Sequence, residues 1–512
     1  MYASSHSSGI VAAGHVETAR AGQQMLQQGG NAFDAAIAAT LASFVAESSL
    51  TSFGGGGFMT AYEAHSGKSA LFDFFVQTPK RRRPLAEVEF IESHINFGTT
   101  LQKQYIGRGS AAVPGCPDGL WHIHRRLGSL PMKVILEPAL RLCKEGIVLT
   151  PYQAYSMSIL EPILLHSAES RAIFEYQGRL VAEGDRIYRP RFADTLEHLE
   201  RDGIRAFYEG EIAQRLDQES RESGGSLFLE DLKQYRTIER APVRLPFQDH
   251  LLLTNCPPSA GGSMIAFGLA LLKDLKLPAP TGKAYVKLLV EVLKGMSAFR
   301  GAQLTPAALQ AGDWTSWFEP EAVNPLRKEM DWLGNTTHIS VLDQAGNAAS
   351  ITTTIGGAAG FNIPGTGIPH NNMLGETDLH PGGMYGWEPD QRVTSMMSPS
   401  IVLKANQARI VLGSGGSSRI RTAILQVLLN LIQHGMPVEE AVSYPRLHWE
   451  ADRLNLEPGL LSSREAFDWE GSDATHWDGP NMFFGGCHTV VSTEAGLAGA
   501  ADARRDGAVL SG

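Results

Sequence analysis

Residues 335–354 read NTTHISVLDQAGNAASITTT and predict a β-hairpin whose open end is crowded with threonines. Gly346 suits the left-handed position of a three-residue loop, and that loop fixes how the two strands pair. Counting back from the loop places Thr336 opposite Thr354, and a slip of one residue would still set a threonine or its neighbour across from Thr336 and Thr337. The hairpin therefore gathers several hydroxyl groups at one end.

These hydroxyl groups gain chemistry only beside a base, because a threonine hydroxyl is otherwise a poor nucleophile. One such base is the amine of the same residue, set free when the preceding peptide bond is cut. We therefore place a self-cleavage site between Asn335 and Thr336. On this segment alone a purely structural hairpin is the alternative, because threonine is a common strand residue.

Five further motifs flank the hairpin along the chain, and each is weak when taken singly. They are Gly29-Gly30-Asn31-Ala32-Phe33-Asp34-Ala35-Ala36, Ser52-Phe53-Gly54-Gly55-Gly56-Gly57-Phe58, Pro257-Pro258-Ser259-Ala260-Gly261-Gly262, Ser395-Met396-Met397-Ser398-Pro399 and Gly413-Ser414-Gly415-Gly416-Ser417-Ser418-Arg419-Ile420. In this order around Thr-Thr-His-Ile-Ser-Val, the set resembles the γ-glutamyltranspeptidase family of N-terminal-nucleophile hydrolases. The resemblance extends from about residue 9 to Arg505.

The resemblance implies an α+β fold, the four-layer αββα sandwich of N-terminal-nucleophile hydrolases. It further implies a precursor that cleaves itself into a large subunit, 1–335, and a small subunit, 336–512, which together form one domain. The family reaction is amide hydrolysis or acyl transfer through an acyl-enzyme, and its usual substrates are γ-glutamyl compounds such as glutathione. We expect no cofactor and no metal site.

The catalytic groups also follow from the resemblance. Thr336 is the nucleophile, its freed amine is the base, and Thr354 orients the Thr336 hydroxyl. The segment 413–417 follows an apolar strand and opens a helix, so its N–H groups are free to bind an oxyanion. The family's two donors fall at Gly416 and Ser417, and the serine keeps a usable N–H if its φ stays negative. An ordinary tight turn is the alternative.

The acyl pocket departs from the family pattern at its carboxylate-binding position. There the family has an arginine, whereas this chain has Phe75, within Asp73-Phe74-Phe75-Val76-Gln77-Thr78-Pro79. An aromatic ring cannot make the bidentate contact that a guanidinium makes with a carboxylate. A basic run, Lys80-Arg81-Arg82-Arg83, follows directly and predicts a solvated basic turn. The alternative is that the run draws anionic substrates toward the cleft, with Arg81 or Arg82 binding the carboxylate.

Other substrate-binding positions change as well. Gly356 and Met373 stand where the family has an asparagine and a glutamine, so two more polar contacts to an amino-acid head group are missing. Glu376 stands at the position of the amine-binding aspartate, and Thr394-Ser395 at that of a serine pair. The expected activity is therefore a γ-glutamyltransferase-like amidohydrolase or acyltransferase. The alternatives are an acylase for an oxamate- or glutaryl-type acyl group, and an inactive relative that serves as a binding protein.

Composition limits the partners and the compartment. The chain has 512 residues and a net charge of −10, which argues against nucleic acid as a partner. Its four cysteines show no metal-binding spacing and predict free thiols in a reducing compartment. The N-terminus has no secretion-signal pattern and no apolar run is long enough to span a membrane, so we expect a cytoplasmic protein. The expected partners are a small amide or peptide substrate and the two subunits, with further dimerisation left open.

Hydrophobic periodicity and turn residues predict the elements around these motifs. Gly54–Gly57 predicts close backbone packing near the site rather than a phosphate cradle, because no Gly-Lys-Ser/Thr follows. The middle third is predicted to be mostly helical. The expected helices are 17–28, 35–44, 118–126, 132–145 and 418–434, and the expected strands are 59–63, 70–76, 337–343, 348–355, 401–403 and 409–412.

Overall fold

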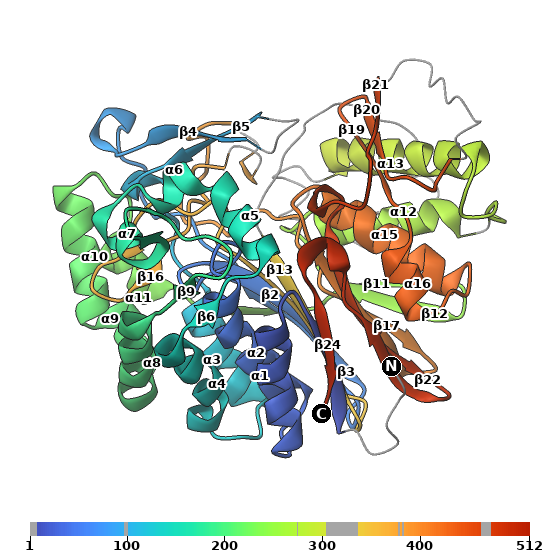
Figure 1. Cartoon of the computed structure of the whole chain (residues 1–512), viewed down its shortest axis with the longest axis horizontal. Helices are drawn as coiled ribbons and strands as arrows, with labels where there is room; N and C mark the ends of the chain where they lie inside the picture. Colours follow the sequence, from blue (N-terminus) through green and yellow to red (C-terminus); the bar gives the residue numbers. More distant parts are fainter. Residues whose placement is uncertain are drawn as a thin grey trace.

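The structure is a computed structural model that describes residues 8–96, 101–273, 275–303, 336–376, 379–380, 383–461 and 473–512. Two β-sheets pack face to face, and helices cover the outer face of each sheet (Figure 1). This arrangement confirms the predicted four-layer αββα sandwich. Within the described residues, no helix is long and apolar enough to cross a membrane.

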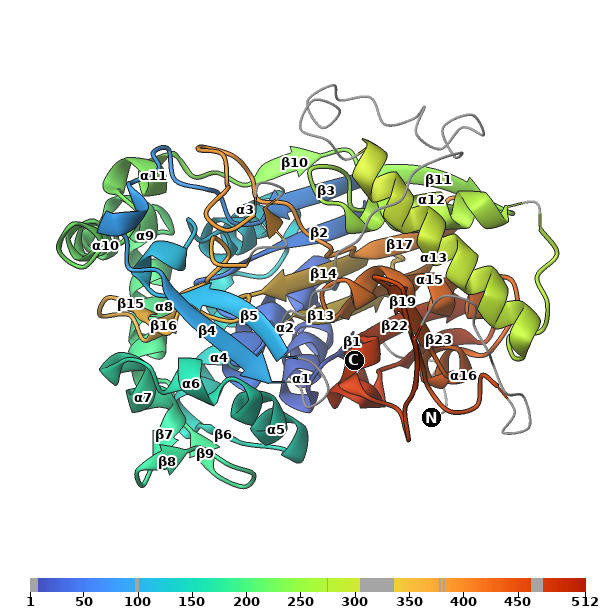
Figure 2. The same ribbon diagram turned by 90° about the horizontal axis from the view of Figure 1, so that it is seen from above.

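The first sheet has seven strands in the order β10-β3-β2-β14-β13-β1-β24, which Figure 2 shows from above. Strands from both ends of the chain meet in it, because β1 pairs on one side with β13 and on the other with β24. Its strands are β1 Gly9–Ala13, β2 Gly56–Glu63, β3 Lys68–Phe74, β10 Ile238–Arg240, β13 Thr337–Asp343, β14 Ala348–Thr354 and β24 Ala508–Ser511.

The second sheet has six strands in the order β11-β12-β17-β18-β22-β23. Apolar side chains of the two sheets meet in a core that lies between them. The strands are β11 Val243–Phe247, β12 His250–Thr254, β17 Ser400–Lys404, β18 Gln407–Gly415, β22 Gly486–Thr493 and β23 Gly496–Ala500.

The helices divide into two outer layers. On the first sheet lie α1 Val16–Gln27 and α2 Ala32–Ala46, backed by α3 Cys116–Leu127 and α4 Met132–Glu145. On the second sheet lie α12 Gly261–Leu272 and α15 Arg419–Ile432, flanked by α13 Lys283–Gln303 and α16 Val438–Ser443. The remaining longer helices are α5 Pro151–Ile159, α7 Ala168–Phe174, α8 Pro190–Asp202, α10 Glu211–Glu222 and α11 Leu229–Gln234.

Helix α2 is the central helix of the first layer, and all of its residues are buried. Its alanine-rich sequence allows this close packing because small side chains let the helix approach the sheet. Asn31 caps its first turn, and Asp34 bonds back to the Asn31 N–H in a capping box. The predicted cap is therefore confirmed, and the helix begins three residues earlier than predicted because the cap starts it at once.

The threonine hairpin has the predicted register. Thr337 pairs with Thr353 and Leu342 with Ala348, so continuing by one residue sets Thr336 opposite Thr354. Gly346 has φ +86, as the three-residue loop requires. Both strands are fully buried between β1 and β2, which explains why no slip occurs: a shift of one residue would turn every side chain to the other face.

One expectation about the elements is confirmed and one is wrong. The middle third is mostly helical, as predicted, and it also contributes β10, β11 and β12. The segment 413–417 is not wholly a loop: Gly413, Ser414 and Gly415 continue β18 by pairing with β22, a strand that the sequence pattern does not identify. Only the residues from Gly416 to Ser418 form the turn into α15.

Candidate active site

Thr336 lies directly before β13, at the end of the first sheet, with 4% of its surface exposed. Its carbonyl oxygen accepts a hydrogen bond of 3.2 Å from Nη1 of Arg505. The same carbonyl lies against Gly415 so closely that a Cβ there would come within 2.1 Å of it. A glycine is therefore required at this position, and the end of β18 and Thr336 are in direct contact.

One row of residues crosses the sheet from Thr336. Thr354 lies opposite Thr336, Gly56 pairs with Thr354, and the backbone of Phe75 lies beside Gly56. With neighbouring strands about 4.8 Å apart, Phe75 is roughly 14 Å from Thr336 along this row. The structure thus brings the predicted nucleophile, its predicted orienting threonine and the predicted acyl-pocket residue to the same end of one sheet.

The glycines between them confirm the predicted close packing. A Cβ on Gly55 would lie 2.1 Å from the carbonyl oxygen of Thr354, and one on Gly57 would lie 2.5 Å from that of Thr352. There is therefore no room for side chains at Gly55 and Gly57, so only backbone atoms of these glycines lie between Thr336 and Phe75 on this part of the sheet.

Thr354 is buried, and its hydroxyl oxygen accepts a hydrogen bond of 3.0 Å from the N–H of Gly356. Gly356 has φ +70, a conformation that a side chain there would strain, and a Cβ would also come within 2.4 Å of Oε1 of Glu376. The N–H of Gly357 donates to the same oxygen at 2.9 Å. Glu376 therefore occupies the space that a side chain at position 356 would take.

The turn at Gly416 and Ser417 is where the sequence predicts an oxyanion-binding loop. Among the described residues, neither N–H donates to a carbonyl outside the regular helices and strands. Gly416 has φ +121 and Ser417 has φ +52, so the expectation of a negative φ at the serine is wrong. Because β18 runs on to Gly415 and α15 begins at Arg419, the chain must reverse within these few residues, and it does so through left-handed conformations.

Thr394 and Ser395 lie near Glu376 but not in contact with the nucleophile. The Thr394 hydroxyl donates to the carbonyl of Leu379 at 2.8 Å, and the Leu379 N–H donates to the carbonyl of Glu376. The Ser395 hydroxyl accepts from the N–H of Met397 at 3.0 Å. Both hydroxyls thus support the loop, and none of their described hydrogen bonds reaches Thr336.

Phe75 is a core residue, only 1% exposed, and its ring packs on Phe58 with the ring centres 5.3 Å apart. Behind it, Asp73 is fully buried and pairs with two arginines, Arg240 at 2.9 Å and Arg392 at 3.3 Å. Arg392 also donates to the carbonyl of Phe75 at 2.6 Å. The cationic groups nearest to Phe75 are therefore engaged by a carboxylate and a carbonyl.

The arginines of the basic run are engaged as well. Arg81 pairs with Glu230 at 3.2 Å. The guanidinium of Arg82 lies over the rings of Trp387 at 5.1 Å and Tyr385 at 6.0 Å. A substrate carboxylate would have to compete with these contacts.

Sequence reasoning missed a buried carboxyl group beside the nucleophile. Glu47, directly after α2, accepts a short hydrogen bond from the hydroxyl of Thr337 and one of 2.7 Å from that of Thr18. Burial raises the pKa of Glu47 to about 7, although both hydroxyls favour the ionised form. No local pattern marks this glutamate, because its partners lie far away in the sequence.

The structure describes the four cysteines but not Asn335. Asn335, on the amino side of the predicted cleavage site, lies outside the described residues. The four cysteines are buried and unpaired, as free thiols should be. Within the described part of the chain, no group of His, Cys, Asp and Glu side chains could hold a metal ion.

Comparisons with known proteins identify the family of this chain. Residues 18–512 match the family model described as Gamma-glutamyltranspeptidase. The chain is 28% identical over 488 residues to the glutathione hydrolase proenzyme of Escherichia coli, covering 88% of this chain and 83% of that protein. It is 31% identical over 475 residues to the acylase ACY 1 proenzyme of Pseudomonas sp. strain SE83, covering 89% and 85%.

A solved structure shares the fold over nearly the whole length. The cephalosporin acylase from Bacillus halodurans superposes with a TM-score of 0.80 at 22% identity, covering 98% of this chain and 96% of that one. At that identity the likeness concerns the fold alone.

Proposed function

This chain belongs to the gamma-glutamyltranspeptidase family of enzymes, and we propose that it is a self-processing amidohydrolase whose nucleophile is Thr336. The observation that carries the proposal is the position of Thr336. It stands at the start of β13, opposite Thr354 and against the end of β18, where the anion-binding turn begins. Residues 1–335 and 336–512 would then be two subunits that stay associated through the shared sheet.

Self-cleavage would proceed by an N-to-O acyl shift. Oγ of Thr336 attacks the carbonyl carbon of Asn335, the C–N bond breaks, and an ester joins the two residues. Water then hydrolyses the ester, which leaves a carboxylate on Asn335 and a free amine on Thr336. The buried surroundings of Thr336 keep its hydroxyl in one place for this attack.

Turnover would reuse the same groups. The freed amine takes the proton from Oγ of Thr336 as that oxygen attacks the substrate amide. The N–H groups of Gly416 and Ser417 stabilise the oxyanion of the tetrahedral intermediate. The positive φ of Ser417 does not remove its N–H from this role, because that group donates to no described carbonyl outside the regular helices and strands. The amine product leaves with the proton, and water or a second amine then releases the acyl group from the threonine.

For the acyl group, two candidates remain, and the buried Phe75 favours one of them. A γ-glutamyl group carries a carboxylate that needs a cationic partner, whereas Phe75 is apolar and Arg392 is already paired with Asp73. An acylase for a glutaryl- or oxamate-type group, which keeps a carboxylate but has no α-amino group, needs fewer polar partners and fits this end better. A γ-glutamyl substrate such as glutathione is the second candidate, and it would need Arg81 or Arg82 to leave its present contacts.

Processing is tested on a denaturing gel and by the intact mass of each band. The wild type should give two chains, and the smaller one should begin at Thr336. Thr336→Ala should remain a single chain and lose all measurable amidase activity, because one hydroxyl serves both reactions. A variant that still splits would move the nucleophile elsewhere, with Thr337 the first suspect. A wild type that stays whole after long incubation would instead favour an inactive relative.

A further inference from the structure

We propose that Arg505 is a positioning residue that fixes the backbone of Thr336 and keeps its freed amine neutral at neutral pH. Arg505 is the last residue of the short helix η7, Ala503–Arg505, and it is 5% exposed. Its hydrogen bond to the Thr336 carbonyl links the C-terminal segment to the nucleophile. The inference rests on the proposed role of Thr336.

The path of the Arg505 side chain is set by glycines. A Cβ on Gly486 would meet the Arg505 Cδ at 2.5 Å, and one on Gly415 would meet Nη1 at 2.9 Å. A Cβ on Gly416 would lie 3.2 Å from Nη2. The guanidinium therefore lies in a slot beneath the anion-binding turn, with its Nη1 directed at Thr336.

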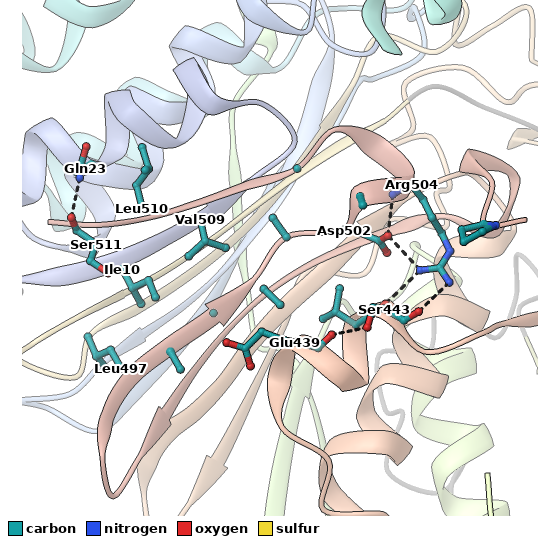
Figure 3. A pocket seen from close by; sticks show the side chains of 18 residues that line it. Ile10, Gln23, Glu439, Ser443, Leu497, Asp502, Arg504, Val509, Leu510 and Ser511 are labelled. Atoms are coloured by element: carbon teal, nitrogen blue, oxygen red, sulfur yellow. Dashed lines mark hydrogen bonds and ion pairs between the residues drawn. The ribbon is translucent and has the colours of Figure 1, made fainter. Parts of the chain in front are cut away.

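Strong ion pairs anchor the segment that carries Arg505. Asp502 caps η7, and its carboxylate pairs with Arg446 at 2.6 Å and Arg504 at 3.2 Å. Figure 3 shows Asp502 and Arg504 joined in this way at the edge of a pocket. Arg504 also bonds to Glu457 from its Nε at 2.7 Å. All four side chains are buried, so η7 presents Arg505 from a rigid support.

The charge of Arg505 acts on the Thr336 amine electrostatically, through space and without a direct contact. Within one residue the amine nitrogen and the carbonyl oxygen are at most about 3.6 Å apart, so Nη1 lies within about 7 Å of the Thr336 amine. A positive charge at this range opposes protonation of the amine and lowers its pKa by about one to two units. A general base must be unprotonated to act, so the arginine extends activity toward lower pH.

Other titratable groups act in the same region. Asp506, which follows η7, and Glu47, which follows α2, are negative when ionised. The two carboxyl groups influence each other electrostatically, and Arg505 influences Glu47 as well. The charges of Arg505, Glu47 and Asp506 act on Tyr152 of α5, whose buried hydroxyl has no hydrogen-bond partner among the described residues. Asp502 also acts electrostatically on Tyr152. His488, in β22, is influenced by both Asp502 and Arg505. The carboxylates oppose the arginine, so changes at positions 505 and 506 should have opposite signs.

The test is the pH profile of kcat/KM for the processed enzyme, measured with the acyl-p-nitroanilide that the wild type cleaves best. Arg505→Met should move the acidic limb upward by about one unit or more. Arg505→Lys should keep the limb within about 0.3 units, because it keeps the charge, while lowering kcat. Asp506→Asn should move the limb downward; asparagine tolerates the left-handed backbone at that position, φ +54. Arg409→Met, a change on the half-exposed part of β18, is the control and should match the wild type.

An acidic limb that stays in place in both Arg505→Met and Asp506→Asn would overturn the inference, and so would equal losses in the Met and Lys variants without a shift. If Arg505→Met fails to process, the Lys and Asn variants still decide the question, since a limb unmoved by Asp506→Asn contradicts the charge effect. A wild type that remains one chain would instead overturn the proposed function and this inference with it. If the wild type is processed and active but the acidic limb of the pH profile does not move in the variants, only the inference about Arg505 is overturned.

Discussion

The two ends of the row that crosses the first sheet differ in chemistry. At one end, Thr336 and Thr337 are held by charged groups, Arg505 on the carbonyl and Glu47 on the neighbouring hydroxyl. At the other end, Phe75 stacks on an aromatic ring and offers no charge. If Thr336 is the nucleophile and Phe75 lies in the acyl pocket, as we propose, bond breaking and acyl recognition depend on separate parts of the molecule, and only the second departs from the family pattern.

Apart from substitutions of Thr336, the largest expected effect is a loss of stability on replacing Asp73, whose ion pairs lie behind Phe75. Asp73→Asn would leave two arginines without their carboxylate, and Arg392 has only 4% of its side chain exposed. We expect a loss of about 3 to 5 kcal/mol in the free energy of unfolding, measured by urea denaturation. Asp390→Asn, at an exposed carboxylate that bonds only to Gln77 in the described residues, should cost less than about 0.5 kcal/mol. Equal losses of stability in the two variants would mean that the ion pairs of Asp73 with Arg240 and Arg392 do not stabilise the region around Phe75.

At the charged end, Glu47 should give the protein a pH-dependent stability. Its folded pKa of about 7 lies above its ordinary 4.5, so the folded state holds the proton more tightly than the unfolded state. Stability should therefore fall as the pH rises between these values, by about 2 to 3 kcal/mol from pH 5 to pH 8. Glu47→Gln should abolish this slope, whereas the exposed Glu439→Gln should keep it. A slope that survives in Glu47→Gln belongs to another group.

Thr354 tests the same end with a smaller change. Thr354→Ala removes a hydrogen-bond acceptor for Gly356 and the predicted contact with the nucleophile, so kcat/KM should fall about three- to tenfold while processing continues. Thr353→Ala is the matched control, because its hydroxyl bonds to Thr51 on the opposite face of the sheet. Thr353→Ala should leave kcat/KM unchanged. An unchanged rate in Thr354→Ala would remove this residue from the mechanism.

The features that sequence predicted well are those that local patterns determine. The hairpin register followed from one loop glycine and from burial of both strands, and the cap of α2 from the spacing of Asn31 and Asp34. The glycines at 54–57 predicted close packing because only backbone could fill that space. Such signals lie within a few residues of what they determine.

The features that sequence missed depend on distant contacts. Arg505 contacts Thr336 and Glu47 contacts the neighbouring Thr337 from opposite ends of the chain, and neither stands in a recognisable pattern. The left-handed Ser417 follows from the length of β18, which in turn depends on pairing with β22. Contacts between distant segments therefore place Glu47 and Arg505 beside the hairpin, whereas the motifs alone predicted that Thr336 and Thr354 would lie opposite each other.

The separation of the two ends is tested most directly by substrate preference. The wild-type kcat/KM is measured with γ-glutamyl-p-nitroanilide, with glutaryl-p-nitroanilide, which lacks only the α-amino group, and with butyryl-p-nitroanilide, which lacks the carboxylate as well. We expect the butyryl and glutaryl compounds to be cleaved at least as well, because the described arginines around Phe75 are already engaged and do not bind the carboxylate of a γ-glutamyl group. A charge-assisted pair with that carboxylate would contribute on the order of 1.5–3 kcal/mol, or about ten- to a hundredfold. A preference of tenfold or more for the γ-glutamyl compound would contradict the account.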